Sequence, residues 1–257
     1  MASPTIQSLD RGLEILSIIA RSGSPMSLND IAGHFAIDRS SVFRLINTLV
    51  QKGFVQQDEE TKRYSLGYKV LELSGFFNEI SNIERLIRPI LKRVVSVTHQ
   101  NTHLAVIDGQ EVVFLAVEQP RDRVTLNLSV GNREPLIATA LGKAMLAFAD
   151  EDELTRVMDR ANFIKYTENT IETPEKLKEV LKHVRINRVA YDNEEYKPGI
   201  VCVAAPVLDH RQHALYSIGI SGPTDLIRPH WEEYSRIVRD AGMEASGLLG
   251  GPVLPEK

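Results

Sequence analysis

Residues 27–51 read SLNDIAGHFAIDRSSVFRLINTLVQ and decide the fold of the N-terminal part of the chain. Apolar residues recur at helical spacing on both sides of a short break at residues 36–38. Ser27 and Asp30 have the spacing of a capping box, and Asp38 can cap a second helix. Two short capped helices across a tight turn indicate a helix-turn-helix. The apolar positions are Leu28, Ile31, Ala32 and Phe35, then Val42, Leu45, Ile46 and Leu49.

The second of these helices carries the candidate chemistry. When its apolar side faces inward, at about 100° per residue, Ser40, Arg44, Asn47 and Gln51 point outward, with Phe43 on the flank. Hydroxyl, guanidinium and amide groups can bind phosphate oxygens and base edges. The alternative is a helical hairpin with an ordinary solvated face. The predicted DNA-binding set on this helix is Arg39, Ser40, Ser41, Phe43, Arg44 and Asn47.

A predicted β-hairpin follows this helix directly. Residues 53–57 and 63–66 have the composition of two strands, and residues 58–62 that of a turn. A hairpin in this place is the wing of a winged helix, and Lys62 and Arg63 at its tip would contact the phosphate backbone. The alternative for both side chains is a solvated turn.

The flanking segments are predicted to be helical. Residues 9–20 place Leu9, Leu13, Leu16 and Ala20 on one side. Residues 68–77 predict a linker helix whose apolar stripe indicates an interface or a core. A further helix is expected over residues 83–98, broken near its start by Pro89. The expected domains are residues 1–66 (winged helix), 67–80 (linker helix), 81–250 (second domain) and 251–257 (frayed tail).

The composition bounds the class of protein. With 257 residues, 43% apolar and 25% charged, the chain is typical of two globular domains. The single cysteine, Cys202, excludes an internal disulfide and fits a reducing compartment. No basic leader opens the chain, and no apolar run approaches the ~20 residues of a membrane span. We therefore expect a cytoplasmic protein without membrane contact.

The charge of the N-terminal part constrains how it could bind DNA. The whole chain carries −4, and its first 75 residues hold eight Lys or Arg against eight Asp or Glu. A neutral domain that binds double-stranded DNA must concentrate its positive charge locally. We expect it to double its contacts by dimerising.

From residue 102 the apolar period changes to that of strands. Strands are predicted over residues 102–107, 111–118, 124–130, 201–207 and 215–221, and helices over 138–149, 151–160, 174–187 and 231–249. Asp108-Gly109 suits a type I′ turn. This mixture predicts an α+β multidomain chain, whose second domain is an antiparallel sheet flanked by helices.

Four features of the second domain could serve a ligand. Residues 135–143 begin a helix with small residues, so its free amides are available to an anion. Residues 191–196 predict an acidic turn before a strand. Cys202 lies within that strand, and Gly219 and Ser221 share a face of another. Each has a structural alternative as a turn residue, a small buried side chain or a helix hydroxyl bonded to its own turn.

Catalytic motifs are weak throughout the sequence. Residues 219–223 lack the second glycine of a nucleophile elbow. Residues 142–144 lack both the upstream glycine and the Ser or Thr of a phosphate loop. The histidines have no zinc-binding spacing. A pairing of Cys202 with His210 or His213 stays open, because spatial proximity cannot be read here. We expect no enzyme, metal or cofactor. The alternatives are a Cys202-dependent hydrolase and a winged helix that docks a protein partner.

Five segments carry a resemblance that covers nearly the whole chain. They are SLDRGLEIL (8–16), RSSVFRLINTL (39–49), YSLG (64–67), TALGKAMLA (139–147) and YDNEEYKPGIVCVAAP (191–206), the last being the most specific. Together they are similar to the isocitrate-lyase-regulator (IclR) family of bacterial transcription factors. The resemblance implies an N-terminal winged helix, a linker helix and a GAF-like effector domain. It also implies a dimer or pair of dimers that regulates a catabolic operon, here expected to be a repressor.

The resemblance implies an effector pocket as well. Its positions would be Thr139, Ala140 and Leu141 at a helix start, with Asp192, Cys202, Gly219 and Ser221. Gly219 stands where some relatives have a serine, and Ala140-Leu141 where a smaller Gly-Ala pair occurs. Amides favour a carboxylate, and Asp192, expected to be ionised, would accept from a hydroxyl. We therefore predict a small organic or sugar acid that carries a hydroxyl or hydrated carbonyl.

Overall fold

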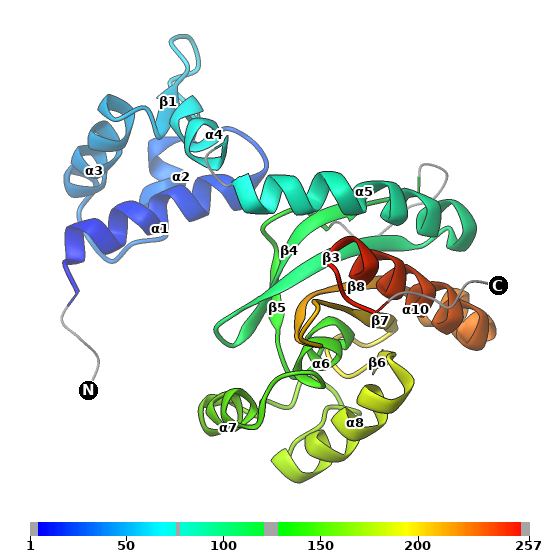
Figure 1. Cartoon of the computed structure of the whole chain (residues 1–257). Helices are drawn as coiled ribbons and strands as arrows, with labels where there is room; N and C mark the ends of the chain where they lie inside the picture. Colours follow the sequence, from blue (N-terminus) through cyan, green and yellow to red (C-terminus); the bar gives the residue numbers. More distant parts are fainter. Residues whose placement is uncertain (1–4, 76–77, 121–127, 253–257) are drawn as a thin grey trace. The chain divides into compact units, whose positions relative to one another are not determined.

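The computed structural model describes residues 5–75, 78–120 and 128–252. The chain divides into two compact units, residues 1–81 and 82–257. The first is mainly helical with one small hairpin, and the second is built on an antiparallel sheet with helices (Figure 1). The predicted α+β class is confirmed.

The helix-turn-helix forms as its caps predict. Its helices are α1 (Gln7–Ser22), α2 (Leu28–Ala32) and α3 (Arg39–Gln51). The Ser27 hydroxyl accepts the Asp30 amide at 3.2 Å, and the Asp30 carboxylate accepts the Ser27 amide at 3.1 Å. Asp38 caps α3 by accepting the Ser41 amide at 2.8 Å. Both caps satisfy amides that have no partner within their helix.

The core contacts of α1 come mainly from its isoleucines. Ile15 and Ile19 are buried, whereas Leu9 and Leu13 are 60% and 56% exposed. Of the four residues predicted to share one side of this helix, Leu16 packs against the core. The other core residues are Ile31, Val42, Ile46, Val55 and Tyr64.

The wing consists of β1 (Val55–Gln57) and β2 (Tyr64–Leu66), paired antiparallel. The Tyr64 ring is buried, and the backbone of Tyr64 exchanges hydrogen bonds of 2.8 and 2.9 Å with Met26. At the base of the wing, a Cβ on Gly67 would lie 2.1 Å from the Gly53 carbonyl oxygen, so only glycine fits. Helix α4 (Tyr68–Gly75) begins there.

The second unit contains a six-stranded antiparallel sheet, curled in Figure 1, in the order β5-β4-β3-β8-β7-β6. Helices α5 and α10 cover one face, and α6, α7 and α8 lie on the other. A short segment of α9 (Thr224–Ile227) and a 3₁₀ turn (Arg228–His230) leads into α10. The strands are β3 (Asn101–Asp108), β4 (Glu111–Glu118), β5 (Arg133–Pro135), β6 (Ala190–Asn193), β7 (Ile200–Leu208) and β8 (Ala214–Pro223). The helices are α5 (Asn78–Thr98), α6 (Ala140–Leu146), α7 (Glu151–Arg160), α8 (Pro174–Asn187) and α10 (Trp231–Leu248).

Close packing identifies which residues face which helix layer. A Cβ on Gly242 of α10 would lie 2.8 Å from the Ala205 methyl, so Ala205 faces α10. A Cβ on Gly219 would lie 3.0 Å from a Leu141 methyl, so Gly219 faces α6. Since neighbours along a strand alternate and paired residues share a face, Cys202 also lies on the α6 side.

Several element boundaries differ from those predicted. The bounds of α7 and α8 are confirmed, but α6 is shorter than residues 138–149 because Thr139 caps it. Residues 190–193 form strand β6 on β7, where a turn was predicted, and the turn begins at Glu194 with φ 59°. The predicted strand 124–130 lies mainly outside the described residues, and residues 128–130 are not a strand.

Two local predictions were wrong. Helix α5 continues through Pro89, which is exposed, so water can satisfy the carbonyl that loses its donor. In the β3–β4 hairpin Asp108 pairs with Glu111, so Gly109 and Gln110 are the central residues. Only Gly109 has positive φ, at 64°, which fits a type II′ rather than a type I′ turn.

Candidate functional site

The outward side of α3 presents the predicted polar set. Arg39, Ser40, Phe43 and Arg44 are exposed, while Ser41 and Asn47 are half-buried. The hydroxyls of Ser40 and Ser41 both donate to the Asp38 carboxylate. These hydrogen bonds, that of Ser40 foremost, lower the pKa of Asp38. A phosphate approaching the start of α3 therefore meets an ionised carboxylate that already engages both serines.

Arg44 is the best-placed cation of this helix. Its guanidinium is exposed and donates only one described hydrogen bond, of 3.2 Å to the Ser41 hydroxyl. Thr48, one turn further along, is also exposed and was not predicted as a contact.

The two predicted wing cations differ in their surroundings. Arg63 donates to the Pro25 carbonyl at 3.0 Å, which ties the wing to the segment before α2. Among the described residues the Lys62 ammonium has no such bond, and its backbone has φ 55°. The same turn exposes Asp58, Glu59 and Glu60. These acidic groups repel phosphate, so the wing tip as a whole is not basic.

The seven predicted effector residues line one cavity on the α6 side of the sheet. Its empty volume is about 430 Å³, including its opening to solvent. The sheet register explains this convergence, because Asp192 pairs with Cys202 and Cys202 with Ser221 across three adjacent strands. The seven are Thr139, Ala140, Leu141, Asp192, Cys202, Gly219 and Ser221.

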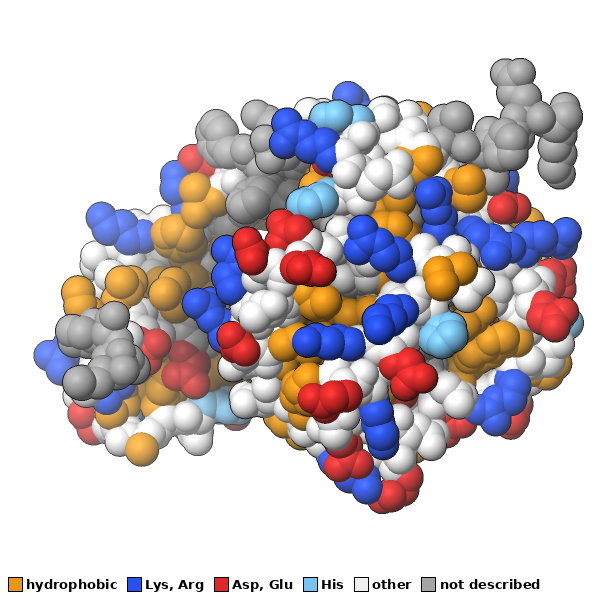
Figure 2. All heavy atoms as spheres, turned by 60° about the horizontal axis from the view of Figure 1, so that its bottom comes forward, with side chains coloured by type: hydrophobic (Ala, Val, Ile, Leu, Met, Phe, Trp, Pro, Cys, Tyr) orange, Lys and Arg blue, Asp and Glu red, His pale blue; other side chains and the backbone are white. Residues whose placement is uncertain are grey.

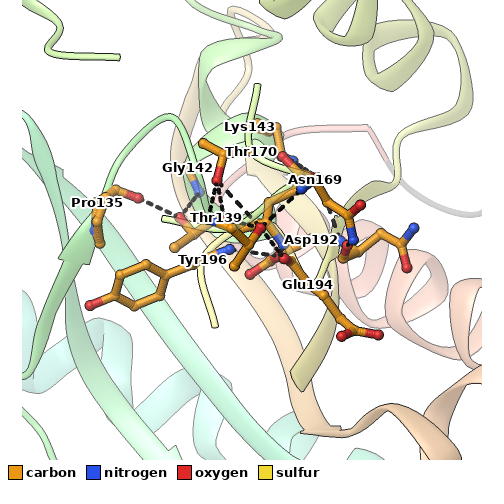
Figure 3. Close-up of polar contacts among 12 residues, drawn as sticks. Pro135, Thr139, Gly142, Lys143, Asn169, Thr170, Asp192, Glu194 and Tyr196 are labelled. Atoms are coloured by element: carbon orange, nitrogen blue, oxygen red, sulfur yellow. Dashed lines mark hydrogen bonds and ion pairs between the residues drawn. The ribbon is translucent and has the colours of Figure 1, made fainter. Parts of the chain in front are cut away.

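The start of α6 forms one end of this cavity. The Thr139 hydroxyl accepts the Gly142 amide at 3.3 Å and donates to the Pro135 carbonyl at 3.0 Å (Figure 3). The helical pattern leaves the amides of Ala140 and Leu141 without an acceptor in their own helix. A Cβ on Gly142 would lie 1.8 Å from the Leu136 carbonyl oxygen, so only glycine allows this helix start.

Asp192 lies beside this helix start and is 2% exposed. Its carboxyl group accepts the amides of Glu195 and Tyr196 at 2.7 and 3.4 Å (Figure 3). Burial raises its pKa to about 7, against the opposing effect of the Lys143 charge. The expectation of a fully ionised Asp192 is therefore wrong at neutral pH, where a large fraction carries a proton that it can donate.

A buried ion pair next to Asp192 was not predicted. The Lys143 ammonium is fully buried and lies 2.5 Å from both carboxylate oxygens of Glu195, which is 8% exposed. This pair joins α6 to the turn after β6. It fixes the helix start against the strand that carries Asp192.

The raised pKa of Asp192 predicts a pH dependence of stability. Because the folded protein holds this proton more tightly than the unfolded chain, the stabilisation is complete below about pH 4 and is lost as the pH rises through 7. Asp192→Asn cannot lose a proton. Between pH 5 and 8 its free energy of unfolding should therefore fall less than that of the wild type, by about 1–3 kcal/mol. Urea unfolding at both pH values measures this, and parallel pH profiles would contradict a raised pKa.

The surroundings of Cys202 do not activate its thiol. Burial, with the Asp192 charge, raises the pKa of Cys202 well above its ordinary value. His210 and His213 lie at the β7–β8 turn, beyond the Leu208–Ala214 pair, whereas Cys202 pairs with Ser221. Six residues of strand separate Cys202 from that turn, about 20 Å. The pairing that the sequence left open is not formed, and an activated thiolate needs such a partner.

Among the other residues that line the cavity are two stacked rings that were not predicted. His103 of β3 and Phe114 of β4 both line it, with stacked rings whose centroids are 5.1 Å apart. His103 Nε2 lies 2.8 Å from the Ser221 hydroxyl. Burial lowers the pKa of His103 to about 3, so its ring is neutral at pH 7. The sequence places His103 on an alternating strand, but only the sheet register brings it beside Ser221.

A winged helix in one unit and a ligand-sized cavity with a few polar side chains in the other are typical of a DNA-binding regulator that responds to a small molecule. Residues 8–59 match the IclR helix-turn-helix domain, and residues 79–246 match the C-terminal domain of the bacterial transcriptional regulator IclR. The chain belongs to the IclR family and is a DNA-binding transcriptional regulator.

The relatives agree with this assignment. The chain is 33% identical over 252 residues to the HTH-type transcriptional regulator BhcR of Paracoccus denitrificans, covering 98% of this chain and 89% of that protein. It is 29% identical over 253 residues to the transcriptional repressor IclR of Escherichia coli K12, covering 97% and 92%. An IclR homologue from Microbacterium hydrocarbonoxydans, solved with 4-hydroxybenzoate, has the same fold at TM-score 0.79 and 20% identity, covering 94% and 98%.

The described part of the chain offers no membrane-spanning helix and no cluster of metal-binding side chains. None of its helices is long and apolar enough to cross a membrane. No group of three or more His, Cys, Asp or Glu residues in the described ranges is placed to hold a metal ion.

Proposed function

We propose that this regulator is a repressor of a catabolic operon, and that a small organic acid bound in the α6-side cavity sets its affinity for the operator. The convergence of seven residues from separate segments on one cavity carries this proposal. A relative named as a repressor and a fold neighbour solved with 4-hydroxybenzoate are consistent with it.

The cavity chemistry favours an acid. The unpaired amides of Ala140 and Leu141 offer two donors for a carboxylate. When protonated, Asp192 adds a third donor, and when ionised it accepts from a hydroxyl. Both protonation states of Asp192 suit an organic or sugar acid with a hydroxyl or hydrated carbonyl. The protonated carboxyl can donate to the carboxylate of the acid, and the ionised one can accept from its hydroxyl.

The N-terminal unit supplies the DNA contacts in this proposal. Arg44 and Asn47 of α3 would read base edges, and Arg39 and Lys62 would bind phosphates. Because the first 75 residues carry equal numbers of basic and acidic side chains, two copies are expected to bind DNA together. Support for a homodimer or tetramer comes from exposed apolar side chains of α1 and α4, which a second copy could cover. They are Leu9, Leu13, Tyr68, Leu71 and Leu73.

Thermal-shift screening of small acids tests the proposal. An acid bound only by the folded protein should stabilise it by about 2.7 kcal/mol at 100 times its Kd. The neutral amide of each acid serves as control and should give no shift. Stabilisation by neutral or cationic compounds, with none by any acid, would contradict the proposal.

A further inference from the structure

One nitrogen in the cavity wall has no partner. His103 is 2% exposed, and its Nδ1 atom is buried without a hydrogen bond to any residue that the structure describes. A buried polar atom left unpaired costs about 1–3 kcal/mol. Since His103 lines the cavity, a ligand atom can fill this role.

The imidazole ring is held in place from two sides. The Nε2 atom is bonded to the Ser221 hydroxyl at 2.8 Å, and the ring stacks on Phe114 with 8° between the planes. These contacts fix both the tilt and the rotation of the ring. The position of Nδ1 is therefore set before any ligand binds, which lowers the entropic cost of binding to it.

The strand neighbour of His103 on β8 is a glycine. His103 pairs in register with Gly219, over which Leu141 lies. A side chain at position 219 would meet the Leu141 methyl at 3.0 Å, so Leu141 occupies the space over this glycine. Gly219 contributes no polar side chain, and His103 and Ser221 are therefore the polar side chains of β3 and β8 that line the cavity.

The two polar ends of the cavity are far apart. Asp192 and Ser221 lie in one row on β6 and β8, with Cys202 between them on β7. Adjacent strands are about 4.8 Å apart, so these two backbones are separated by about 10 Å. A ligand that reaches both ends needs a second polar group remote from the group held at α6.

We propose that His103, oriented by Ser221, is a specificity-determining residue that binds through Nδ1 a hydroxyl of the effector remote from its carboxylate. This inference rests on the proposed function, since it names the residue that contacts the end of the acid remote from the carboxylate bound at α6. A neutral imidazole carries one donor and one acceptor nitrogen, in either tautomer. A hydroxyl can both donate and accept, so it pairs with Nδ1 in both cases, whereas a second carboxylate can only accept.

The test compares acids that differ only in the remote hydroxyl. The probes are 4-hydroxybenzoate with benzoate and 5-hydroxypentanoate with pentanoate, titrated calorimetrically into the full-length protein. The wild type should bind the hydroxylated member of at least one pair about tenfold more tightly, the ratio expected when a buried polar atom gains its partner.

Matched variants separate Nδ1 from Nε2. The side-chain amide of His103→Asn lies near the position of Nδ1, and that of His103→Gln near the position of Nε2. His103→Asn should keep a preference for the hydroxyl, whereas His103→Gln and His103→Phe should reduce it to within about twofold. In the wild type, the ¹⁵N resonance of Nδ1 should shift on adding the preferred acid by more than that of Nε2. This measurement needs no variant to fold.

The outcomes distinguish this inference from the proposed function. Equal preference in the wild type, His103→Gln and His103→Phe would overturn the role of His103 while leaving an acid-binding regulator. Binding only of acids too short to carry a remote hydroxyl would do the same. Absence of binding by every acid, including those of the thermal-shift screen, would overturn the proposed function itself.

Discussion

Lys143→Met is expected to lower the free energy of unfolding by about 3–5 kcal/mol. The substitution removes the only described ion-pair partner of Glu195 and leaves a carboxylate that is 8% exposed. An uncompensated charge in such a place is costly, although the intact pair contributes little compared with well-packed apolar residues. Chemical denaturation at pH 7 measures the change.

A double variant provides the matched control. Lys143→Met combined with Glu195→Leu removes both charges and should recover most of the lost stability, because no buried carboxylate is left alone. A loss below about 1 kcal/mol in Lys143→Met would contradict the burial of this pair. Since the pair joins α6 to the turn after β6, the double variant should still bind acids more weakly than the wild type.

Arg44→Ala is expected to weaken binding to the operator by about 10–100-fold at constant salt. One arginine contact to a base or phosphate in a specific complex is worth about 1–3 kcal/mol. Arg44 is exposed on α3 and forms no ion pair with any described residue. Fluorescence anisotropy with DNA from upstream of the gene itself measures this affinity.

The control for this experiment removes the same charge elsewhere. Arg160→Ala, at the end of α7 in the second unit, should change DNA affinity by less than about threefold, since Arg160 is exposed and belongs to no predicted DNA contact. Both variants should bind acid like the wild type. Loss of acid binding together with DNA binding in Arg44→Ala would contradict separate sites.

The elements that sequence predicts best are those with local signals. The cap residues Ser27, Asp38 and Thr173 each begin a helix where expected, because a cap is satisfied within one turn. Short edge strands were harder. The sequence predicts a turn where strand β6 forms, because four residues are too few to show the alternation of polar and apolar side chains. Only pairing with β7 makes them a strand.

The cavity was predicted only in part from the sequence. Local sequence features and the resemblance to a known family together supplied its seven predicted positions, which the structure brings together. His103 and the Lys143–Glu195 pair carried no local signal, since their partners lie 118 and 52 residues away. The protonation of Asp192 likewise depends on burial, which a single sequence does not report. Predicting these features would have required the strand register between distant segments and the burial of each side chain.

An acid bound in the cavity is expected to control the affinity of the winged helix for DNA. The most direct measurement is the Kd of the full-length protein for the upstream DNA, at fixed salt, with and without a saturating concentration of the acid that gives the largest thermal shift. The account predicts a change of about 5–150-fold, corresponding to a coupling free energy of about 1–3 kcal/mol. It also predicts that saturating DNA changes the affinity for the acid by the same factor. Equal DNA affinity with and without the acid would contradict it.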